Sequence, residues 1–598
     1  MSRAFVRTLK HNMKNERPSH VLFFDVESDL VKIDKNKYKF IPFLWTGIYK
    51  HYRYGNGKDT EIELSGTTLD SFWGAIEDYS YPKTKLYVVS HHLEVDFLPL
   101  GGFTYLNKYG WTLNSLISHG RVVTLYCKRL TTSLIIMNNG NLFDGSIEQW
   151  GNTFGVPKLT MPSNRKNMGE WVTYCKRDTL ILKMMWDKLL EFMDQHDLGN
   201  FKASRASLAM NAFRHRFMNY EINIHDDPVV TVLERDSYHG GRFEALKIGD
   251  FTGDTYYQLD TNSMYGYIES SCMLPYALQG YEEEVPIDKA LHLLKSYSCI
   301  ATCLVDTNEP YLPVKVETKV KYLTGKHIIT MCTPELLYAL KHKQVKHIYY
   351  LAYYKQGLIF KEYADYFMQL KDQYTRENNL PMRTLAKFFP NALYGKFGQY
   401  GYDDKVIGEC DPEIFKIEEG YNVETKKRYT IMSYGGKVHQ TITTDSSYYT
   451  FVAIASHITA YGRMMLYKMM KRAGLSHVYH VATDSVVVDS IGYKRLQSMI
   501  DPVKPGYLKL EKTFTNYSIK GINDVVTDGQ EKIKGIPKKA TKIDDNTYIC
   551  TNWPRITTLI KEGMPDTYYT RTVVKHLNRP DYKEFIRQVN AGDTSIIA

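Results

Sequence analysis

Acidic residues interrupt apolar, strand-like runs at three places in this sequence, and this pattern limits how the chain can fold. Asp25 lies in the run 21–26, and Glu27 follows that run directly. Asp260 follows the run 256–259, and Asp484 lies within the valine-rich run 480–488. A carboxylate in such a strand is costly to bury unless a partner or a cation sits beside it. We therefore expect a fold in which strands carry these acids to cation-binding positions.

The order of the predicted elements divides the chain into several units. At about 100–200 residues per domain, 598 residues predict roughly three to six of them. Strand-like runs at residues 21–26, 85–90, 122–126 and 133–137 precede a helical stretch at 168–194, and this order predicts an α/β unit over residues 1–186. Further helices are predicted at residues 361–376, 382–397 and 447–472; Pro390 should kink the second, Asp445 or Ser446 should cap the third, and Gly474 should end it.

The composition is compatible with a nucleic-acid-binding protein but does not require one. Lysine and arginine number 76 against 66 acids, a formal charge of +10, which would attract a polyphosphate if it lined one groove and would otherwise only aid solubility. The 48 tyrosines suit either a base-stacking channel or a tyrosine-rich core. Eight cysteines without zinc-ligand spacing favour a reduced setting. With no secretory signal and no run near the ~18–20 apolar residues of a membrane span, we expect a soluble cytoplasmic protein.

The first third of the chain holds an ordered set of acids. Asp25 and Glu27, two apart on a strand, share one face, and Asp96 follows. Tyr174 and Asp178 share one face of a helix. Each acid alone could be an ordinary surface or strand-end residue. Together, four carboxylates and a tyrosine can hold two divalent ions and orient a water, which predicts a 3′–5′ exonuclease site.

A second set of residues lies in the middle and the last third of the chain. If the strands of Asp260 and Asp484 lie side by side, their carboxylates can hold two magnesium ions against a triphosphate and a primer end. The alternative is that both are turn residues at strand ends. Lys387, Asn391 and Tyr394 share a helical face that could bind phosphates and a base, or could belong to an ordinary amphipathic helix.

Taken in order, these motifs resemble those of the protein-primed family B DNA polymerases, the bacteriophage phi29-like replicases of phages, viruses and linear plasmids. The resemblance spans about residues 22–539. In the first part it matches the three exonuclease motifs to Asp25 with Glu27, to Asp96, and to Tyr174 with Asp178, the additional exonuclease lysine to Lys158, and single-stranded DNA contacts to His92 and Ser146. His92 stands where the family carries asparagine.

In the second part, the resemblance assigns residues to DNA and to the incoming nucleotide. It matches the template-contacting Tyr-x-Gly-Gly element to Tyr238, Gly240, Gly241 and Arg242, and the primer-steadying Lys-x-Tyr motif to Tyr517. Motif A corresponds to Asp260 and to Tyr265, which excludes ribonucleotides, and motif C corresponds to Asp484 and Ser485. Motif B corresponds to Lys387, Asn391, Tyr394 and Gly395, and the basic residue before it to Lys371. The sequence departs from the family at Ala482, which replaces the first acid of motif C, at Pro390 and Ala392 in motif B, and at the missing lysine before Tyr517, although Lys512 and Lys520 lie near.

The resemblance implies an α/β and α+β multidomain fold, in which a ribonuclease H-like 3′–5′ exonuclease domain precedes a right-hand polymerase of palm, fingers and thumb with two inserted terminal-protein-region segments. The expected boundaries are 1–186 for the exonuclease, 187–273 for the first part of the palm, 274–358 for the first inserted segment, 359–399 for the fingers, 400–445 for the second inserted segment with a role in strand displacement, 446–530 for the second part of the palm, and 531–598 for the thumb.

The function implied is template-directed, protein-primed DNA synthesis with proofreading on a linear viral or plasmid genome. The expected cofactor is Mg²⁺, two ions per site with Mn²⁺ as a substitute, held by Asp260 and Asp484 in one site and by Asp25, Glu27, Asp96 and Asp178 in the other. The expected partners of a monomeric enzyme are primer-template DNA, dNTPs, a terminal protein and a single-stranded DNA-binding protein, with no membrane. Two alternatives remain: a primer-independent polymerase, and a nuclease or DNA-binding replication protein whose polymerase site has decayed, which Ala482 would mark.

Overall fold

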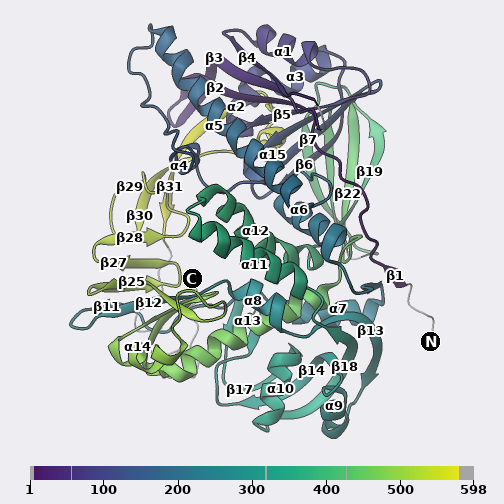
Figure 1. Ribbon diagram of the computed structural model, residues 1–598, viewed down its shortest axis with the longest axis vertical. Helices are drawn as coiled ribbons and strands as arrows, with labels where there is room; N and C mark the ends of the chain where they lie inside the picture. Colours follow the sequence, from purple (N-terminus) through teal and green to yellow (C-terminus); the bar gives the residue numbers. More distant parts are fainter. Residues whose placement is uncertain (1–5, 55–56, 317–318, 426, 578–598) are drawn as a thin grey trace.

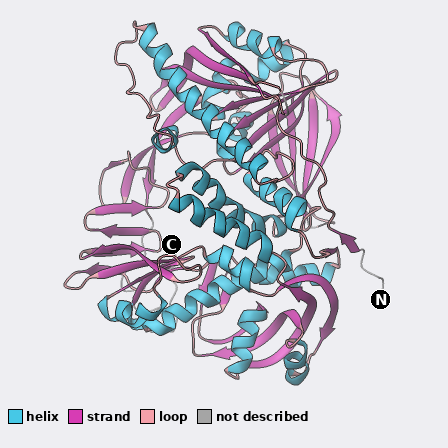
Figure 2. Cartoon of the chain, viewed as in Figure 1, coloured by secondary structure: helices cyan, strands magenta, loops and turns pink. Residues whose placement is uncertain are grey.

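The computed structural model describes residues 6–54, 57–316, 319–425 and 427–577 (Figure 1). A strand-rich N-terminal unit lies at the top of Figure 1, helices cross the centre, and two further strand-rich regions lie below. Figure 2 shows the same alternation of strands and helices. Among the described residues, no helix is both long and apolar enough to cross a membrane.

A mixed sheet forms the centre of the N-terminal unit. Its strands are β2 (His20–Asp34), β3 (Lys37–His51), β4 (Thr60–Gly66), β5 (Lys85–Ser90), β6 (Thr112–His119), β7 (Val122–Arg129) and β8 (Thr132–Asn138). The parallel strands β2, β5 and β8 are its core. From the other end of the chain, β29 (Thr541–Lys542), β30 (Thr547–Asn552) and β31 (Tyr569–His576) join the same sheet through β3. The segment expected as the thumb therefore shares a sheet with the N-terminal unit, and its residues 578–598 lie outside the described chain.

Both faces of β2 are buried, which explains its continuous apolar run. Val21 and Phe23 pack on the side of α5 (Met168–Gln195), whereas Leu22 and Phe24 pack on the side of α1 (Leu69–Asp78). The short helices α2 (Leu93–Asp96), α3 (Gly102–Lys108) and α4 (Ile147–Thr153) complete this unit. The predicted α/β unit is thus present, and β5 has the predicted bounds.

The second sheet carries the other pair of acids. Its order is β10 (Phe243–Ala245), β23 (Val478–Ala482), β24 (Ser485–Val488), β12 (Tyr256–Thr261) and β25 (Leu508–Phe514). The long helix α13 (Val452–Ala473) packs Leu466 and Met469 against this sheet. An adjacent sheet contains β11 (Gly249–Phe251), β26 (Tyr517–Gly521), β27 (Asp524–Thr527) and β28 (Gln530–Ile533), and α14 (Ser490–Leu496) follows β24.

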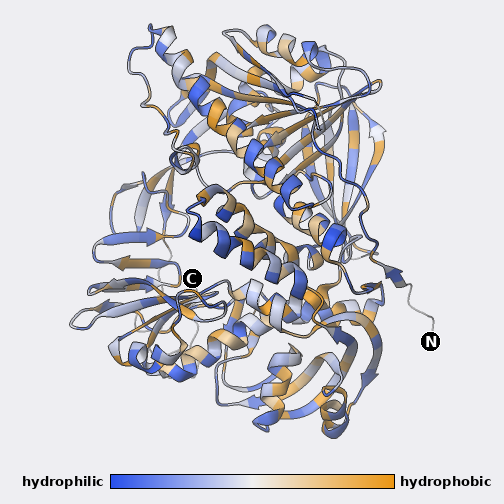
Figure 3. Ribbon diagram, in the orientation of Figure 1, coloured by the Kyte–Doolittle hydropathy of each residue, from blue (hydrophilic) through white to orange (hydrophobic). Residues whose placement is uncertain are grey.

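Two paired helices, α11 (Lys361–Arg376) and α12 (Leu380–Phe397), run through the centre of the molecule. They pack against α6 (Arg205–Ala212) and α8 (Met264–Ser271). Figure 3 shows that each carries a hydrophilic and a hydrophobic side. The bounds of α11 are those predicted, and α12 continues through Pro390, a residue that cannot donate a backbone hydrogen bond to the preceding turn.

The two segments expected as insertions each form a sheet. In the first, β13 (Leu274–Glu283), β14 (Tyr297–Thr307), β17 (Gly325–Cys332) and β18 (Val345–Gly357) pair with one another and, at the edge, with β9 (Asn223–His225) and β1 (Val6–Thr8). In the second, β19 (Gly401–Glu409), β20 (Lys416–Asn422), β21 (Lys427–Tyr434) and β22 (Lys437–Thr444) form a sheet of four. The second packs onto the N-terminal unit, where the rings of Phe103 and Phe415 lie 5.1 Å apart. The remaining elements are α7 (Pro228–Ser237), α9 (Ile287–Leu293), α10 (Thr333–Lys341), α15 (Ile556–Lys561), β15 (Pro313–Val316) and β16 (Lys319–Tyr322).

Two predictions about local structure are wrong. Residues 480–488 are not one strand, because β23 ends at Ala482 and β24 begins at Ser485. Helix α13 begins at Val452, so Asp445 and Ser446 do not cap it. The preceding residues instead bind the end of α12, where Phe451 N donates to Phe397 O at 2.9 Å and Thr450 donates to Gln399 O at 2.8 Å. The predicted end of α13 is confirmed, since Gly474 follows it with φ +87°.

Candidate active sites

The first candidate site lies where β2 meets α5. The carboxylates of Asp25 and Glu27 and the Sγ atom of Cys175 lie within 4.8 Å of one another. The Cys175 thiol donates to Oδ2 of Asp25 at 3.4 Å and accepts a hydrogen bond from the Thr46 hydroxyl at 3.2 Å. The predicted pair on β2 is thus brought together with a thiol that the sequence analysis did not single out.

Helix α5 also contributes Tyr174 and Asp178, one turn apart. Lys158 forms an ion pair with Oδ2 of Asp178, and its amine lies 4.9 Å from the centre of the Tyr174 ring. The other oxygen of Asp178, Oδ1, is buried without a hydrogen-bond partner among the described residues. Asp96 is buried on α2, where its carboxylate accepts from the backbone of His92 at 3.3 Å.

The acids of this cluster repel one another in a water-poor place. Burial, followed by repulsion from Asp178, raises the pKa of Asp25 to about 7. Burial, followed by repulsion from Asp25, raises the pKa of Glu27 to about 8. Burial and Asp25 likewise raise the pKa of Asp96. A divalent cation would remove this repulsion, so the donor set and the unpartnered Oδ1 fit such an ion.

The second candidate site lies at the end of β12. Asp260 pairs across the sheet with Ser485 of β24 and Lys509 of β25. Asp484 lies in the turn between β23 and β24, where its carbonyl accepts from Thr261 N at 2.8 Å. The strands β12 and β24 are neighbours, as predicted, but Asp484 lies in the turn before β24 and not in a strand.

Neighbouring backbone holds this turn in an unusual conformation. Thr483 has φ +59°, which β-branched residues rarely adopt, and its N–H donates to Arg242 O at 2.7 Å. Asp484 N donates to Ala482 O at 2.8 Å. A Cβ added at Gly241 would lie 2.8 Å from a side-chain carbon of Thr483. Gly241 is therefore required for the close approach of residues 238–242 to the turn.

Two charged residues of β25, missed by the sequence analysis, face the acids. Lys509 Nζ lies 3.5 Å from Asp260 and 2.8 Å from Glu511. The register between β12 and β25 shifts between Gln258 and Leu259, so Glu511 is the extra residue of a β-bulge. Burial, then Asp484, raises the pKa of Asp260 to about 6, with Glu511 adding repulsion. Only the tertiary pairing could have revealed Glu511, because nothing in its local sequence marks it.

A group of cations and rings faces these acids from the paired helices. Lys371 donates to Ser263 at 2.7 Å and to Asn262 at 3.0 Å. Burial lowers the pKa of Lys371, and Arg383, Lys387 and Lys509 act in the same direction. The rings of Tyr265 and Tyr394 stack with centres 4.9 Å apart. The predicted nucleotide-binding residues therefore meet at one place, with Arg383 and Lys509 as additions.

A cavity of about 790 Å³ lies between this helix pair and the N-terminal unit. Lys387, Phe388 and Asn391 of α12 line one wall, and Arg121 and Arg205 line the other. Gly395 is exposed on the same helix. The cavity joins the helix that faces the second site to the unit that contains the first.

Not every residue assigned to DNA is placed to contact it. Arg242 is 0% exposed and pairs with Glu244, and Tyr517 is 3% exposed in an aromatic cluster with Tyr256 and Phe514. Direct DNA contact by these two side chains was predicted and is contradicted by their burial. Ser146 caps α4 through Gln149 N, which gives it a structural role. Tyr238 and Gly240 keep some exposure, Ser485 begins β24, and His92 is exposed beside the first site.

A buried ion pair, also missed from sequence, connects three regions. Arg463 of α13 pairs with Glu335 of α10 at 2.7 Å. The same guanidinium donates to the carbonyls of His239 at 2.7 Å and Gly240 at 3.0 Å. The pair thus holds the loop at residues 238–242, which contacts the Asp484 turn through the hydrogen bond from Thr483 N to Arg242 O.

Solved structures with this fold include that of phi29 DNA polymerase. A complex with primer-template DNA matches with a TM-score of 0.62 at 15% identity, over 93% of this chain and 99% of that one. A complex that also holds incoming nucleotides matches with a TM-score of 0.63 at 15% identity, over 94% of this chain and 100% of that one. At this identity the match shows the fold, and it confirms the predicted multidomain class.

The sequence comparisons define the family. The model for DNA polymerase type B, organellar and viral, matches residues 158–474, more than half of the chain, and this chain belongs to that family. A probable DNA polymerase of Ascobolus immersus is 25% identical over 367 residues, and a DNA polymerase of Kluyveromyces lactis is 22% identical over 288 residues. The aligned regions cover 58% and 45% of this chain but only 28% of each relative. The predicted membership of the type B polymerases is confirmed.

Proposed function

We propose that this chain is a DNA-directed DNA polymerase with a separate 3′–5′ exonuclease site, and that it replicates a linear viral or plasmid genome from a protein primer. The observation that carries the proposal is the meeting of Asp260, near the end of β12, with Asp484, in the turn before β24, opposite the cations of α11 and α12. Neither half alone would suffice, because nucleotidyl transfer needs acids for metal ions and cations for the triphosphate.

The residues of both sites fit divalent ions, with Mg²⁺ as the expected one. Asp260 and Asp484 would hold them in the polymerase site, and Asp25, Glu27, Asp96 and Asp178 would hold them in the exonuclease site. When bound, such ions activate the attacking oxygen and neutralise the leaving group. Glu511 lies near enough to repel Asp260, so it could supply the acid that Ala482 does not.

In the polymerase site, the side chains of the protein hold and orient the nucleotide. Lys387, Lys371 and Arg383 would bind its phosphates as fixed charges, in a region where they already repel one another. The stacked rings of Tyr265 and Tyr394 would enclose the sugar and base and select by shape. The cavity beside Asn391 leaves room for an unpaired template strand.

In the exonuclease site, the chain positions the scissile phosphate and a water. Tyr174 and Lys158 stand together over Asp178, so the lysine can hold the carboxylate ionised while the phenol orients the water. The two sites lie in different units, which allows a frayed 3′ end to leave one and enter the other.

Protein priming is supported by the two inserted sheets and by the fold shared with phi29 polymerase. A terminal protein would present a hydroxyl side chain in place of the primer end. A single-stranded DNA-binding protein is a further expected partner. A primer-independent relative would begin synthesis on naked template without any added protein.

Extension of a labelled primer-template by the purified chain tests the proposal. With Mg²⁺ and dNTPs the primer should lengthen, and without dNTPs it should shorten from its 3′ end. Asp484→Ala should lose extension and keep degradation. If the native chain degrades but never extends, the polymerase assignment fails and Ala482 marks a decayed site.

A further inference from the structure

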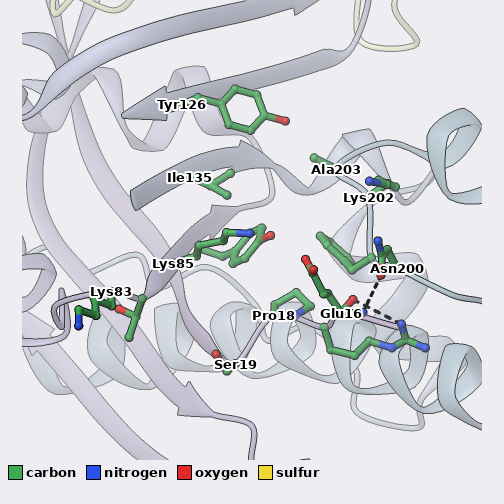
Figure 4. A pocket seen from close by; sticks show the side chains of 14 residues that line it. Glu16, Pro18, Ser19, Lys83, Lys85, Tyr126, Ile135, Asn200, Lys202 and Ala203 are labelled. Carbon is green, nitrogen blue, oxygen red and sulfur yellow. Dashed lines mark hydrogen bonds between the residues drawn. The ribbon is translucent and has the colours of Figure 1, made fainter. Parts of the chain in front are cut away.

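A cavity of about 440 Å³ opens in the N-terminal unit at the end of the sheet opposite the carboxylates (Figure 4). The parallel strands β2 and β5 begin beside it, at His20 and Lys85, and run toward the exonuclease acids. Three chain segments that the proposed function does not use form it: residues 16–19, residues 83–87 with their sheet neighbours, and residues 200–203. Its volume lies in the range of small-ligand pockets, about 300–1,000 Å³.

The floor of this cavity is aromatic. Tyr87, Ile135 and Tyr126 lie in one row across β5, β8 and β7, since Ile135 pairs with both tyrosines. Phe201 closes the row, with its ring 5.6 Å from Tyr87 at 89°. Neither tyrosine hydroxyl makes a hydrogen bond recorded within the described chain, and burial raises the pKa of both phenols, so both remain proton donors. Flat rings with free hydroxyls suit a nucleobase.

The rim of the cavity is basic. Lys83, Lys85 and Lys202 line it, and none of them forms a salt bridge within the described ranges. Burial lowers the pKa of Lys202. Attraction to Glu16 raises it in part, and repulsion from Arg214, Lys85 and Lys14 lowers it further. Glu16 itself lies 3.4 Å from the amine of Lys14. The rim thus has more positive than negative charge, and an anion would relieve the repulsion.

Hydrogen bonds fix the walls before any ligand arrives. Glu16 N donates to the Asn200 side chain at 2.7 Å, and Phe201 N donates to Glu16 O at 2.8 Å. Arg17 does not serve the cavity as a free charge, because its guanidinium is held by Asp194 at 2.8 Å and by the carbonyl of Gly199. A preformed wall lowers the cost of ordering on binding.

We propose that this cavity binds one unpaired nucleotide, with the base on the Tyr87–Tyr126 floor and the phosphate at Lys83, Lys85 and Lys202. The same chemistry could come from a free mononucleotide or from one unit of a single strand. In either case the site is distinct from both catalytic sites, because none of the residues that line it belongs to either of them.

Photo-crosslinking of the full chain tests the proposal. The probes are 5-iodo-dUMP and a twelve-residue oligo-dT with one central 5-iododeoxyuridine, used in EDTA so that neither is degraded or extended. We expect crosslinked peptides that contain Tyr87 or Tyr126. Crosslinking by 5-iodo-dUMP identifies a mononucleotide site, and crosslinking by the oligonucleotide alone identifies a strand site.

Charge and ring variants make the result decisive. Lys85→Glu with Lys202→Glu should reduce this crosslink about tenfold, whereas Lys58→Glu, an exposed lysine of the same unit outside the cavity, should not. Tyr126→Phe, which keeps the ring and loses only the hydroxyl, should weaken binding less than Tyr126→Ala, which removes both. Primer extension by each variant reports that it is folded. Absence of any crosslink at the floor, or a crosslink unchanged in the double lysine variant, overturns the proposal.

Discussion

In both candidate sites, carboxylates lie close enough to repel one another, but the groups around them differ. The N-terminal site encloses its acids between β2 and α5 and adds Lys158 and a thiol. The central site holds Asp260 near the end of the inner strand β12 and Asp484 in the adjacent hairpin turn, with Lys509 beside Asp260. In the first site the counter-charge that pairs with an acid comes from Lys158, whereas in the second the counter-charges come from three other elements, β25, α11 and α12. Burial and mutual repulsion raise the pKa of Asp25 to about 7 and that of Glu27 to about 8, whereas they raise the pKa of Asp260 only to about 6.

The largest expected effect separates the two sites completely. Asp25→Ala with Glu27→Ala should reduce 3′ degradation by about 10³-fold or more, because metal ligands contribute several kcal/mol at ~1.4 kcal/mol per tenfold. Primer extension should stay within about twofold. Single-turnover degradation and extension measure both, and equal loss of the two activities would show that the sites are not independent.

The next effect concerns the bulge residue of β25. Glu511→Gln should reduce extension about 10–100-fold and raise the Mg²⁺ concentration needed for half-maximal rate, because one carboxylate near Asp260 is lost. Degradation should not change. Glu531→Gln on β28, an exposed acid that pairs with Lys542 as Glu511 pairs with Lys509, is the matched control. An unchanged Mg²⁺ requirement would remove Glu511 from the metal site.

Cys175 allows cadmium binding at the N-terminal site to be distinguished from cadmium binding at the central site. Cd²⁺ should give a cadmium–thiolate absorption band in the ultraviolet through Cys175, and it should inhibit degradation more strongly than extension, since the central site offers only oxygen donors. Cys175→Ser should lose the band, whereas Cys127→Ser, a buried cysteine in the other face of the same unit, should keep it. A band that persists in Cys175→Ser would place the ion elsewhere.

The smallest effect is on stability. The acids of the N-terminal site have pKa values raised from about 4 toward 7 and 8, so the folded chain binds more protons than the unfolded chain between these limits. Metal-free protein should therefore lose stability as pH rises from about 4 to 8. Its Tm should fall over this window, Mg²⁺ should restore it most at the alkaline end, and Asp25→Asn with Glu27→Gln should flatten the slope. A flat profile in the native chain would contradict the enclosed character of this site.

Local patterns predicted much of the architecture. The apolar run of β2, the bounds of α11 and the glycine after α13 depend on near neighbours, and all three are observed. The start of α13 was not predictable from nearby residues, because contacts with the end of α12 keep residues 447–451 out of the helix. The burial of Arg242 and Tyr517 was equally hidden, since a motif match gives a residue type and not its exposure.

Residue order and short-range periodicity were enough to predict the family, the strands of Asp25 and Asp260 and the helical face of Lys387. Tertiary structure alone decided which further groups stand beside the acids: Cys175 with Asp25, Lys509 and Glu511 with Asp260, and Arg463 with the loop at Gly240. It alone assembled the aromatic floor and lysine rim from three distant segments. The physical reason is that charge interactions and stacking act through space, between residues whose separation along the chain carries no signal.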